Sequence, residues 1–158
     1  MVRLLIADND LPEARILHSP SASVTVFDDD LRLLIEDLWD TMESARGVGL
    51  AAPQIGVPLR VAVIDTKHTD SSHRKIALVN PTIIDSSGSQ LDQEGCLSLP
   101  GLSWPITRPN YVRVTYQDEN GLDSIITGRG LLARALVHET EHLQGILCNS
   151  IALKSVPQ

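Results

Sequence analysis

Two histidines four residues apart, near the C-terminal end, constrain this chain more than any other feature. His138 and His142 flank Glu139 in the pattern H-E-x-x-H, within residues 130–142, which predict a helix closed by Gly145. Side chains at positions i and i+4 lie on one face of a helix, so both imidazoles can bind a single metal ion. Glu139 projects about 100° around the helix and can reach a water on the metal without being a ligand. The pattern therefore predicts a metal-dependent hydrolase, with a solvent-facing helix as the simpler alternative.

The third metal ligand is not settled by spacing. A catalytic ion of this kind usually takes three protein ligands and keeps one position open. No Asp, Glu or His follows His142, so a downstream carboxylate ligand is excluded. Downstream, Cys148 stands where the third histidine falls in an H-E-x-x-H-x-x-G-x-x-H motif, with Gly145 in its proper place. The upstream candidates are Cys96, His73, His68 and His18.

Composition narrows the class of protein. Of the 158 residues, 42% are hydrophobic and only 3% aromatic, which predicts a folded chain with an aliphatic core. The formal net charge of −7 argues against general nucleic-acid binding, which depends on Lys and Arg. No apolar run approaches the roughly 20 residues of a membrane helix. We expect one soluble domain, residues 1–158, with both cysteines as thiols in a reducing compartment.

The hydrophobic pattern predicts an α+β fold. Asp28 is expected to cap a helix whose apolar residues recur at i, i+3, i+4 and i+7, with Gly47 just past its end. Short runs rich in β-branched residues predict strands at residues 60–65, 75–79, 111–116 and 124–127. Pro81 should end the second strand, and a turn at residues 118–121 should join the last two as a hairpin. We therefore expect mostly antiparallel sheets packed around a central C-terminal H-E-x-x-H helix, with a further helix near the N-terminus.

Two other segments contain residues suited to hydrolysis. Cys96 lies in E-G-C-L-S, residues 94–98, where glycines and a proline nearby predict a tight turn. Taken alone, such a cysteine is more often a small buried hydrophobe. Residues 47–56 are rich in small side chains, which let a bound peptide strand approach, and Gln54 could donate to a developing oxyanion. This segment follows a helix and lacks a Lys-Ser/Thr ending, so it is not a phosphate loop.

Taken in order, these segments resemble the peptide deformylase family. Members of that family carry G-x-G-x-A-A-x-Q, E-G-C-L-S and H-E-x-D-H segments, which correspond here to residues 47–54, 94–98 and 138–142. The likeness runs from about Leu11 to Leu147, nearly the whole chain. Three motifs in register are far more specific than any one of them.

The resemblance implies a metal centre formed by Cys96, His138 and His142. These residues would bind one divalent ion, with water in the fourth position. The ion in this family is usually Fe(II) in the cell, and Zn, Ni or Co are found as substitutes. One thiolate and two imidazoles suit all of these ions, so the ligand set does not choose among them.

The resemblance also implies how the remaining residues act. Glu139 would be the general base and then the acid that protonates the departing amine. Gln54 and the backbone N–H of Leu97 would bind the oxygen of the formyl carbonyl. The peptide would lie as an added strand along Gly49. The methionine pocket would be formed by Val48, Leu97, Ala135 and His138.

The implied substrate is the N-formyl-methionyl end of a nascent polypeptide, and the products are formate and a free N-terminus. We expect a monomer in the cytoplasm of a bacterium, in host cytoplasm if virus-encoded, or in an organelle, with no membrane or nucleic-acid partner. Many family members continue into a basic helix that docks on the ribosome. Residues 143–158 contain one Lys and no Arg, so stable docking through this end is not expected.

Three residues depart from the family pattern. Glu141 stands where Asp is usual, and its extra methylene is expected to shift a contact, toward Arg108. Val137 precedes the first histidine, where a polar residue is common. Ser103 occupies a position that often carries an Arg near the substrate backbone, which puts affinity for extended peptides in doubt.

Two other functions compete with this prediction. One is a metallopeptidase that uses Cys148 in place of Cys96, although it leaves the first two segments unexplained. The other is a non-catalytic protein that only binds formylated N-termini or uses the metal structurally. That protein would need a broken site, whereas Gln54, Cys96, Glu139 and both histidines are all present.

Overall fold

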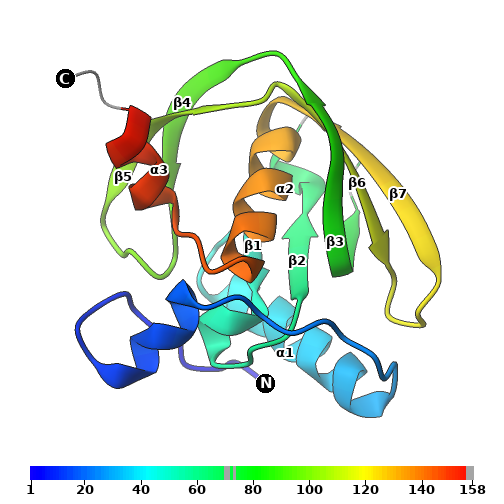
Figure 1. Ribbon diagram of the computed structural model, residues 1–158. Helices are drawn as coiled ribbons and strands as arrows, with labels where there is room; N and C mark the ends of the chain where they lie inside the picture. Colours follow the sequence, from blue (N-terminus) through cyan, green and yellow to red (C-terminus); the bar gives the residue numbers. More distant parts are fainter. Residues whose placement is uncertain (70–71, 73, 156–158) are drawn as a thin grey trace.

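The computed structural model describes residues 1–69, 72 and 74–155, and Figure 1 shows their arrangement. A five-stranded antiparallel sheet has the order β1-β2-β3-β6-β7, and β4 and β5 form a separate two-stranded sheet. The strands are β1 (Gly49–Ala51), β2 (Val61–Asp65), β3 (Lys75–Ser87), β4 (Gln90–Gly95), β5 (Ser103–Arg108), β6 (Tyr111–Gln117) and β7 (Asp123–Arg129). The helices are α1 (Asp29–Ser44), α2 (Gly130–Leu143) and α3 (Cys148–Ser155), with 3-10 turns η1 (Pro12–His18), η2 (Ala52–Ile55) and η3 (Thr66–His68).

The expected α+β architecture is confirmed. Helix α2 carries the H-E-x-x-H residues and lies between the β4–β5 hairpin and the five-stranded sheet (Figure 1). Its apolar side chains, among them Leu132 and Leu136, pack with those of the sheet in one buried cluster. The helix ends as predicted, because Gly145 follows the C-cap with φ +79° and lies against the backbone of His18 and Ser19. Almost any side chain at position 145 would collide with that backbone.

Helix α1 begins where the sequence predicts, since the Asp28 carboxylate accepts a hydrogen bond from the backbone N–H of Leu31. Its end was predicted wrongly. Arg46, not Gly47, adopts the left-handed conformation, with φ +57°. Gly47 is the next residue, and its N–H donates to the carbonyl of Met42 at 2.9 Å. A Cβ at Gly47 would lie 2.9 Å from Leu97, so the glycine is needed for that close approach rather than for the helix end.

The second predicted strand is longer than expected. Pro81 does not end β3, because the strand continues to Ser87. The pairing with β6 shifts register between Val79 and Thr82, and Asn80 has φ +52° there. A proline lacks the N–H of a regular ladder and is tolerated at such an irregularity. The β6–β7 hairpin is confirmed, whereas β4, β5 and α3 were not anticipated.

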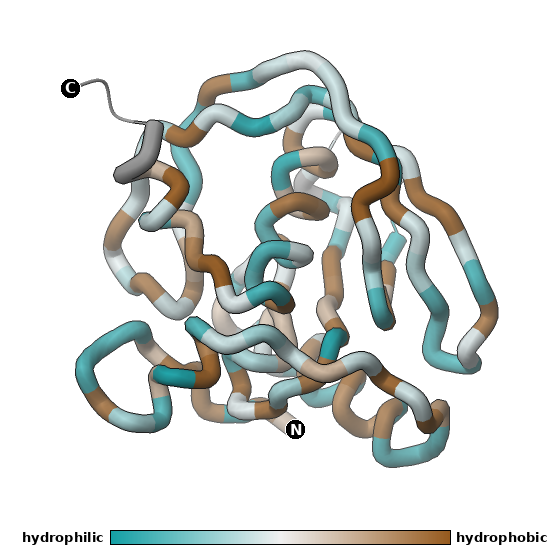
Figure 2. The backbone as a smooth tube through the Cα atoms, viewed as in Figure 1, coloured by the Kyte–Doolittle hydropathy of each residue, from teal (hydrophilic) through white to brown (hydrophobic). Residues whose placement is uncertain are grey.

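The core is aliphatic, as the composition predicts. The buried hydrophobic residues of the described chain are Ala, Val, Leu, Ile, Met and Cys, with no aromatic among them. Figure 2 shows hydrophobic segments along β2 and α2, and every residue of β2 is buried. In the described part of the chain, no helix is both long enough and apolar enough to cross a membrane.

Candidate metal centre and substrate pocket

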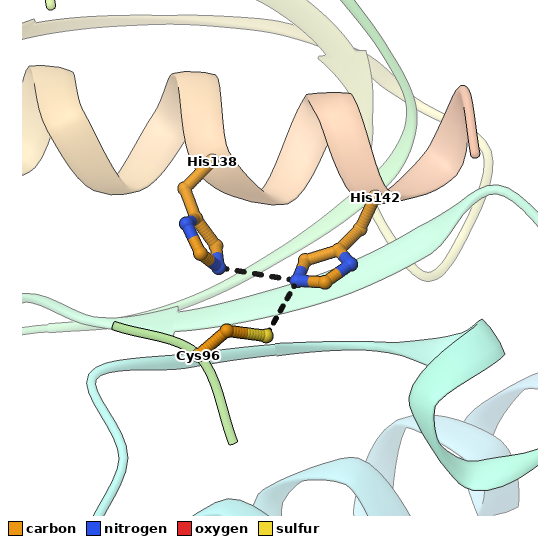
Figure 3. Close-up of side chains that lie close together, drawn as sticks. All are labelled: Cys96, His138 and His142. Atoms are coloured by element: carbon orange, nitrogen blue, oxygen red, sulfur yellow. Dashed lines mark hydrogen bonds between the residues drawn. The ribbon is translucent and has the colours of Figure 1, made fainter. Parts of the chain in front are cut away.

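Three candidate ligands from two different elements meet beside α2. Cys96 follows the end of β4, and His138 and His142 project from one face of α2 toward it (Figure 3). The Sγ of Cys96 lies 3.2 Å from Nε2 of His142, which lies 3.1 Å from Nε2 of His138. The three ligand atoms all lie within 4.8 Å of one another. The two helix positions i and i+4 thus present their nitrogens to a single sulfur.

The chemistry of this donor set fits a divalent cation. Metal–ligand bonds of about 2.0–2.3 Å at tetrahedral angles separate the ligand atoms by roughly 3.3–3.6 Å. The observed separations of 3.1 and 3.2 Å are close to that range. A thiolate and two imidazoles are ligands for Fe, Zn, Ni and Co alike. The residues present are therefore compatible with a bound metal.

Cys148 occupies a different position. Its sulfur lies within 4.8 Å of ligand atoms of Glu94 and His138, but His142 does not belong to that set of ligand atoms. Burial raises the pKa of the Cys148 thiol to about 11, and only the thiolate is a good metal ligand. Among the other candidates, His18 bonds to Asp8 through Nε2 at 2.7 Å. His73 and the side chain of His68 lie outside the described residues.

Glu94 is the functional residue that sequence reasoning missed. One of its oxygens accepts from Nδ1 of His138 at 2.8 Å and the other from Arg134 at 2.8 Å. Arg108 donates hydrogen bonds to both oxygens of Glu94, at 3.0 and 2.6 Å. Burial opposes ionisation of Glu94, but hydrogen bonds from His138 and Arg108 hold its pKa well below the usual range. In the sequence, the available signals were a Glu two residues before Cys96 and an Arg one turn before His138.

Glu139 lies buried at the same place. Its Oε1 has no hydrogen-bond partner among the described residues. Its Oε2 faces Gly49, where an added Cβ would lie only 2.5 Å from that oxygen. Burial raises the pKa of Glu139 to about 7. A carboxyl group in this state can both accept and release a proton near neutral pH.

Gln54 is fixed by its neighbours beside Cys96. Its Oε1 accepts from the N–H of Ala51 at 3.0 Å, which leaves the amide nitrogen pointing toward the metal ligands. That nitrogen donates to Cys96 Sγ at 3.4 Å and to the hydroxyl of Ser98 at 3.2 Å. A preorganised donor of this kind costs little reorganisation when charge develops nearby.

A cavity of about 320 Å³ joins these groups. All of the predicted site residues line it except His142, which is buried beneath. The predicted lining residues are Val48, Gly49, Gln54, Cys96, Leu97, Ala135, His138 and Glu139. Residues not predicted to line it are Gly47, Gln93, Glu94, Gly95, Leu131 and Arg134.

Two of the three departures from the family pattern have defined contacts. Glu141 pairs with Arg108 at 2.6 Å, which confirms the expected contact. Ser103 donates to the side chain of Gln93 at 3.1 Å, and Gln93 lines the cavity. Val137 is buried in the cluster between α2 and the sheet, where an apolar side chain is suitable.

Comparison with known proteins gives one consistent family. The family model described as polypeptide deformylase matches residues 6–155. Peptide deformylase 1 of Bacillus subtilis (strain 168) is 45% identical over 137 residues, covering 87% of this chain and 84% of the relative. A crystal structure of a peptide deformylase from Legionella pneumophila superposes with a TM-score of 0.88 at 42% identity, covering 96% and 86% of the two chains. One from Synechococcus elongatus, in complex with actinonin, gives 0.86 at 38% identity, covering 95% and 78%.

Proposed function

Because this chain belongs to the peptide deformylase family, we propose how its own residues perform the reaction of that family. The chain is a metal-dependent hydrolase that removes the formyl group from the N-terminal formyl-methionine of nascent polypeptides. Water adds to the formyl carbon, the bond between that carbon and the methionine nitrogen breaks, and formate leaves. The free amine takes the proton that balances the reaction.

Cys96, His138 and His142 would hold the metal, which we propose is Fe(II) in the cell, with Zn, Ni or Co in preparations. An ion held there lowers the pKa of water and polarises a carbonyl group. The convergence of one sulfur and two Nε2 atoms at 3.1–3.2 Å supports this assignment. Glu94 supports it further, because it occupies Nδ1 of His138 and so leaves Nε2 free to be a ligand.

Glu139 would accept the proton of the attacking water and then donate it to the departing amine. A pKa near 7 suits both transfers, because the group is ionised in part at neutral pH and its conjugate acid is a competent donor. Gln54 and the N–H of Leu97 would bind the carbonyl oxygen as negative charge develops on it. The amide nitrogen of Gln54, 3.4 Å from Cys96, is suitably close.

The substrate chain would lie along Gly49 as an added strand, with the methionine side chain against Val48, Leu97 and Ala135. These residues line one cavity together with Cys96. Strand addition along an exposed sheet edge is a common mode of peptide recognition, and β1 is an edge strand. We further propose that residues 1–158 act as one catalytic domain, as a monomer in the cytoplasm, without stable docking to the ribosome through the C-terminal segment.

The observation that carries this proposal is the meeting of three ligand atoms beside a cavity that Glu139 also lines, with no hydrogen-bond partner for its Oε1 among the described residues. The test is formate release from a short formyl-Met peptide by anaerobically purified, Fe(II)-loaded protein. Turnover should be on the order of 1–100 per second. Glu139→Ala should keep one metal per chain and lose turnover by at least about a hundredfold.

Other results would contradict the proposal. Full turnover in Glu139→Ala would remove that residue as general base. Metal-loaded wild-type protein that binds the peptide without releasing formate would instead be a binding protein. Cleavage of internal peptide bonds, lost in Cys148→Ser, would establish the metallopeptidase.

A further inference from the structure

The candidate metal ligands come from two parts of the fold, one near the two-stranded sheet and one packed against the five-stranded sheet. Cys96 follows β4, and among the described strands β4 pairs only with β5, in a sheet separate from the five-stranded one. His138 and His142 belong to α2, which packs against the larger sheet. The hairpin and the helix lie side by side in Figure 1. The separation between hairpin and helix therefore decides whether the sulfur and the two imidazoles meet.

Arg134 spans that separation. It lies on α2 one turn before His138, and it is 4% exposed. One guanidinium nitrogen donates to Glu94 on β4 at 2.8 Å, and another donates to the backbone carbonyl of Ile106 on β5 at 3.0 Å. The second nitrogen also approaches the carbonyl of Gln90 on β4 at 3.5 Å. A single side chain of α2 thus contacts both strands of the hairpin.

The contact with Glu94 continues to a metal ligand. Arg134 holds one carboxylate oxygen, and His138 contacts the other through Nδ1 at 2.8 Å. Arg134 and His138 are four residues apart on one helix face, so Glu94 bridges two successive turns of α2. A carboxylate bonded in this way fixes the orientation of the imidazole ring.

A second link joins the same elements farther along the helix. Arg108 on β5 pairs with Glu141 of α2 at 2.6 Å and with Glu94 at 2.6 Å. This link lies beside His142, whereas Arg134 lies N-terminal to His138.

Gln90 on β4 also donates to the carbonyl of Gly130, the first residue of α2, at 2.7 Å. Arg134 differs from that contact because it bonds to both strands of the hairpin and to the carboxylate that contacts His138. Without Arg134, Cys96 could therefore shift relative to both histidines.

We propose that Arg134 is a positioning residue that holds the β4–β5 hairpin against α2, so that Cys96 meets His138 and His142 in the geometry of a metal site. It acts through Glu94 and the carbonyl of Ile106, without touching the metal. This inference rests on the proposed function only for the identity of the three ligands.

The test measures metal binding rather than turnover. Arg134→Met keeps the apolar stem and removes every donor of the guanidinium. The matched control is Arg60→Met, because Arg60 is half-buried and likewise donates to a strand carbonyl, that of Pro81, away from the ligands. For each protein, the Kd for Co(II) is measured by competition with a chelator, together with the visible spectrum of the Co(II) form. Urea unfolding of the metal-free proteins is measured in parallel.

Arg134→Met should raise the Kd for Co(II) by about 10- to 100-fold and shift the visible Co(II) bands. Arg60→Met should leave the Kd within about twofold of wild type and the bands unchanged. Should Arg134→Met fail to fold, Arg134→Lys replaces it. Lysine keeps a positive charge near Glu94 but lacks the planar fork with which arginine bonds to both Glu94 and Ile106, so a smaller rise in Kd is expected.

Two results would overturn the inference. The first is a folded Arg134 variant whose Kd for Co(II) and visible Co(II) bands are unchanged. This holds even if the metal-free form of that variant is less stable to urea, because lower stability alone indicates a merely structural role. Wild-type protein that binds no Co(II) would overturn the proposed metal centre as well, which separates the two failures.

Discussion

The ligand role of His138 depends on which of its ring nitrogens carries a proton. Glu94 has a strongly lowered pKa and is therefore an ionised carboxylate, which can only accept hydrogen bonds. Nδ1 of His138 must then be the donor in their 2.8 Å contact. In the neutral imidazole, which is the form that binds a metal, this leaves the lone pair on Nε2, which faces His142 and Cys96. A single buried carboxylate thereby selects the tautomer that a metal ligand requires.

The two cysteines should respond differently to substitution. Cys96→Ser should lower metal affinity by at least about a hundredfold, because a soft thiolate is replaced by a weakly coordinating hydroxyl. Cys148→Ser should leave the metal content near one per chain, because the Cys148 sulfur does not belong to the set of ligand atoms that includes both histidines. Metal analysis after gel filtration measures both. Full metal content in Cys96→Ser would contradict the ligand assignment.

Glu94 should also give the protein a distinctive acid response. Its pKa is lower in the folded than in the unfolded chain, so its stabilising effect is present above about pH 4.3 and is lost as the pH falls further. For metal-free protein, Glu94→Gln should lower the free energy of unfolding by about 3 kcal/mol between about pH 5 and 8. The difference from wild type should shrink below about pH 4.

Urea unfolding across this pH series measures the effect. Glu119→Gln is the control, since Glu119 is exposed and its replacement should cost less than about 0.5 kcal/mol. A Glu94→Gln difference that stays constant down to pH 3 would mean that ionisation of Glu94 does not stabilise the fold.

At the scale of elements, a glycine near each end of α2 allows close packing against a neighbouring segment. A Cβ at Gly128, just before the helix, would lie 2.8–2.9 Å from Leu136 and Leu132. A Cβ at Gly145 would lie 2.7–2.8 Å from the backbone of His18 and Ser19. Glycine at these positions lets the helix sit close to β7 at one end and to the N-terminal segment at the other. The position of His142, three residues before Gly145, depends on the second approach.

Gly145→Ala should therefore destabilise the protein more than an alanine at another glycine of similar φ. Gly101 has φ +75° with nothing near its missing Cβ, so Gly101→Ala should cost only the conformational strain of about 1 kcal/mol. Gly145→Ala adds a clash with rigid backbone and should cost about 3 kcal/mol or more. Denaturant unfolding of both variants measures the difference. Equal costs would show that the N-terminal segment yields easily.

At the scale of the whole molecule, most of the hydrophobic core lies away from the candidate metal ligands. One buried cluster packs α1 against the sheet and a second packs α2 against it, and neither contains a candidate ligand. A chain of this length buries roughly 70% of the surface that its unfolded form exposes. The fold should therefore persist when the metal is removed.

Chelator treatment should leave the far-ultraviolet circular dichroism unchanged and lower the Tm. Binding to the folded state alone adds about 4 kcal/mol of stability when the free ion is a thousandfold above its Kd. Calorimetry of the metal-free and reloaded forms measures this shift. Loss of secondary structure on chelation would show instead that the metal is needed for folding.

Features set by local periodicity were predictable from the residues alone. The i and i+4 placement of His138 and His142, the cap at Asp28 and the β6–β7 hairpin each depend on neighbours within a few positions. Three motifs in register were also sufficient to identify the family. For the helix, its cap and the hairpin, the local pattern was sufficient because their geometry is determined over short stretches of chain.

Features that join distant segments required the tertiary structure. Spacing alone left the third ligand open between Cys148 and upstream candidates that included Cys96, and the family resemblance favoured Cys96. The fold places the Cys96 sulfur beside both imidazoles. The ion pairs of Glu94 with Arg108 and Arg134 connect residues 14 and 40 positions apart, and no local pattern encodes them. The passage of β3 through Pro81 likewise depends on a register shift against β6. In each case the deciding interaction lies between elements, where sequence distance carries no information about spatial distance.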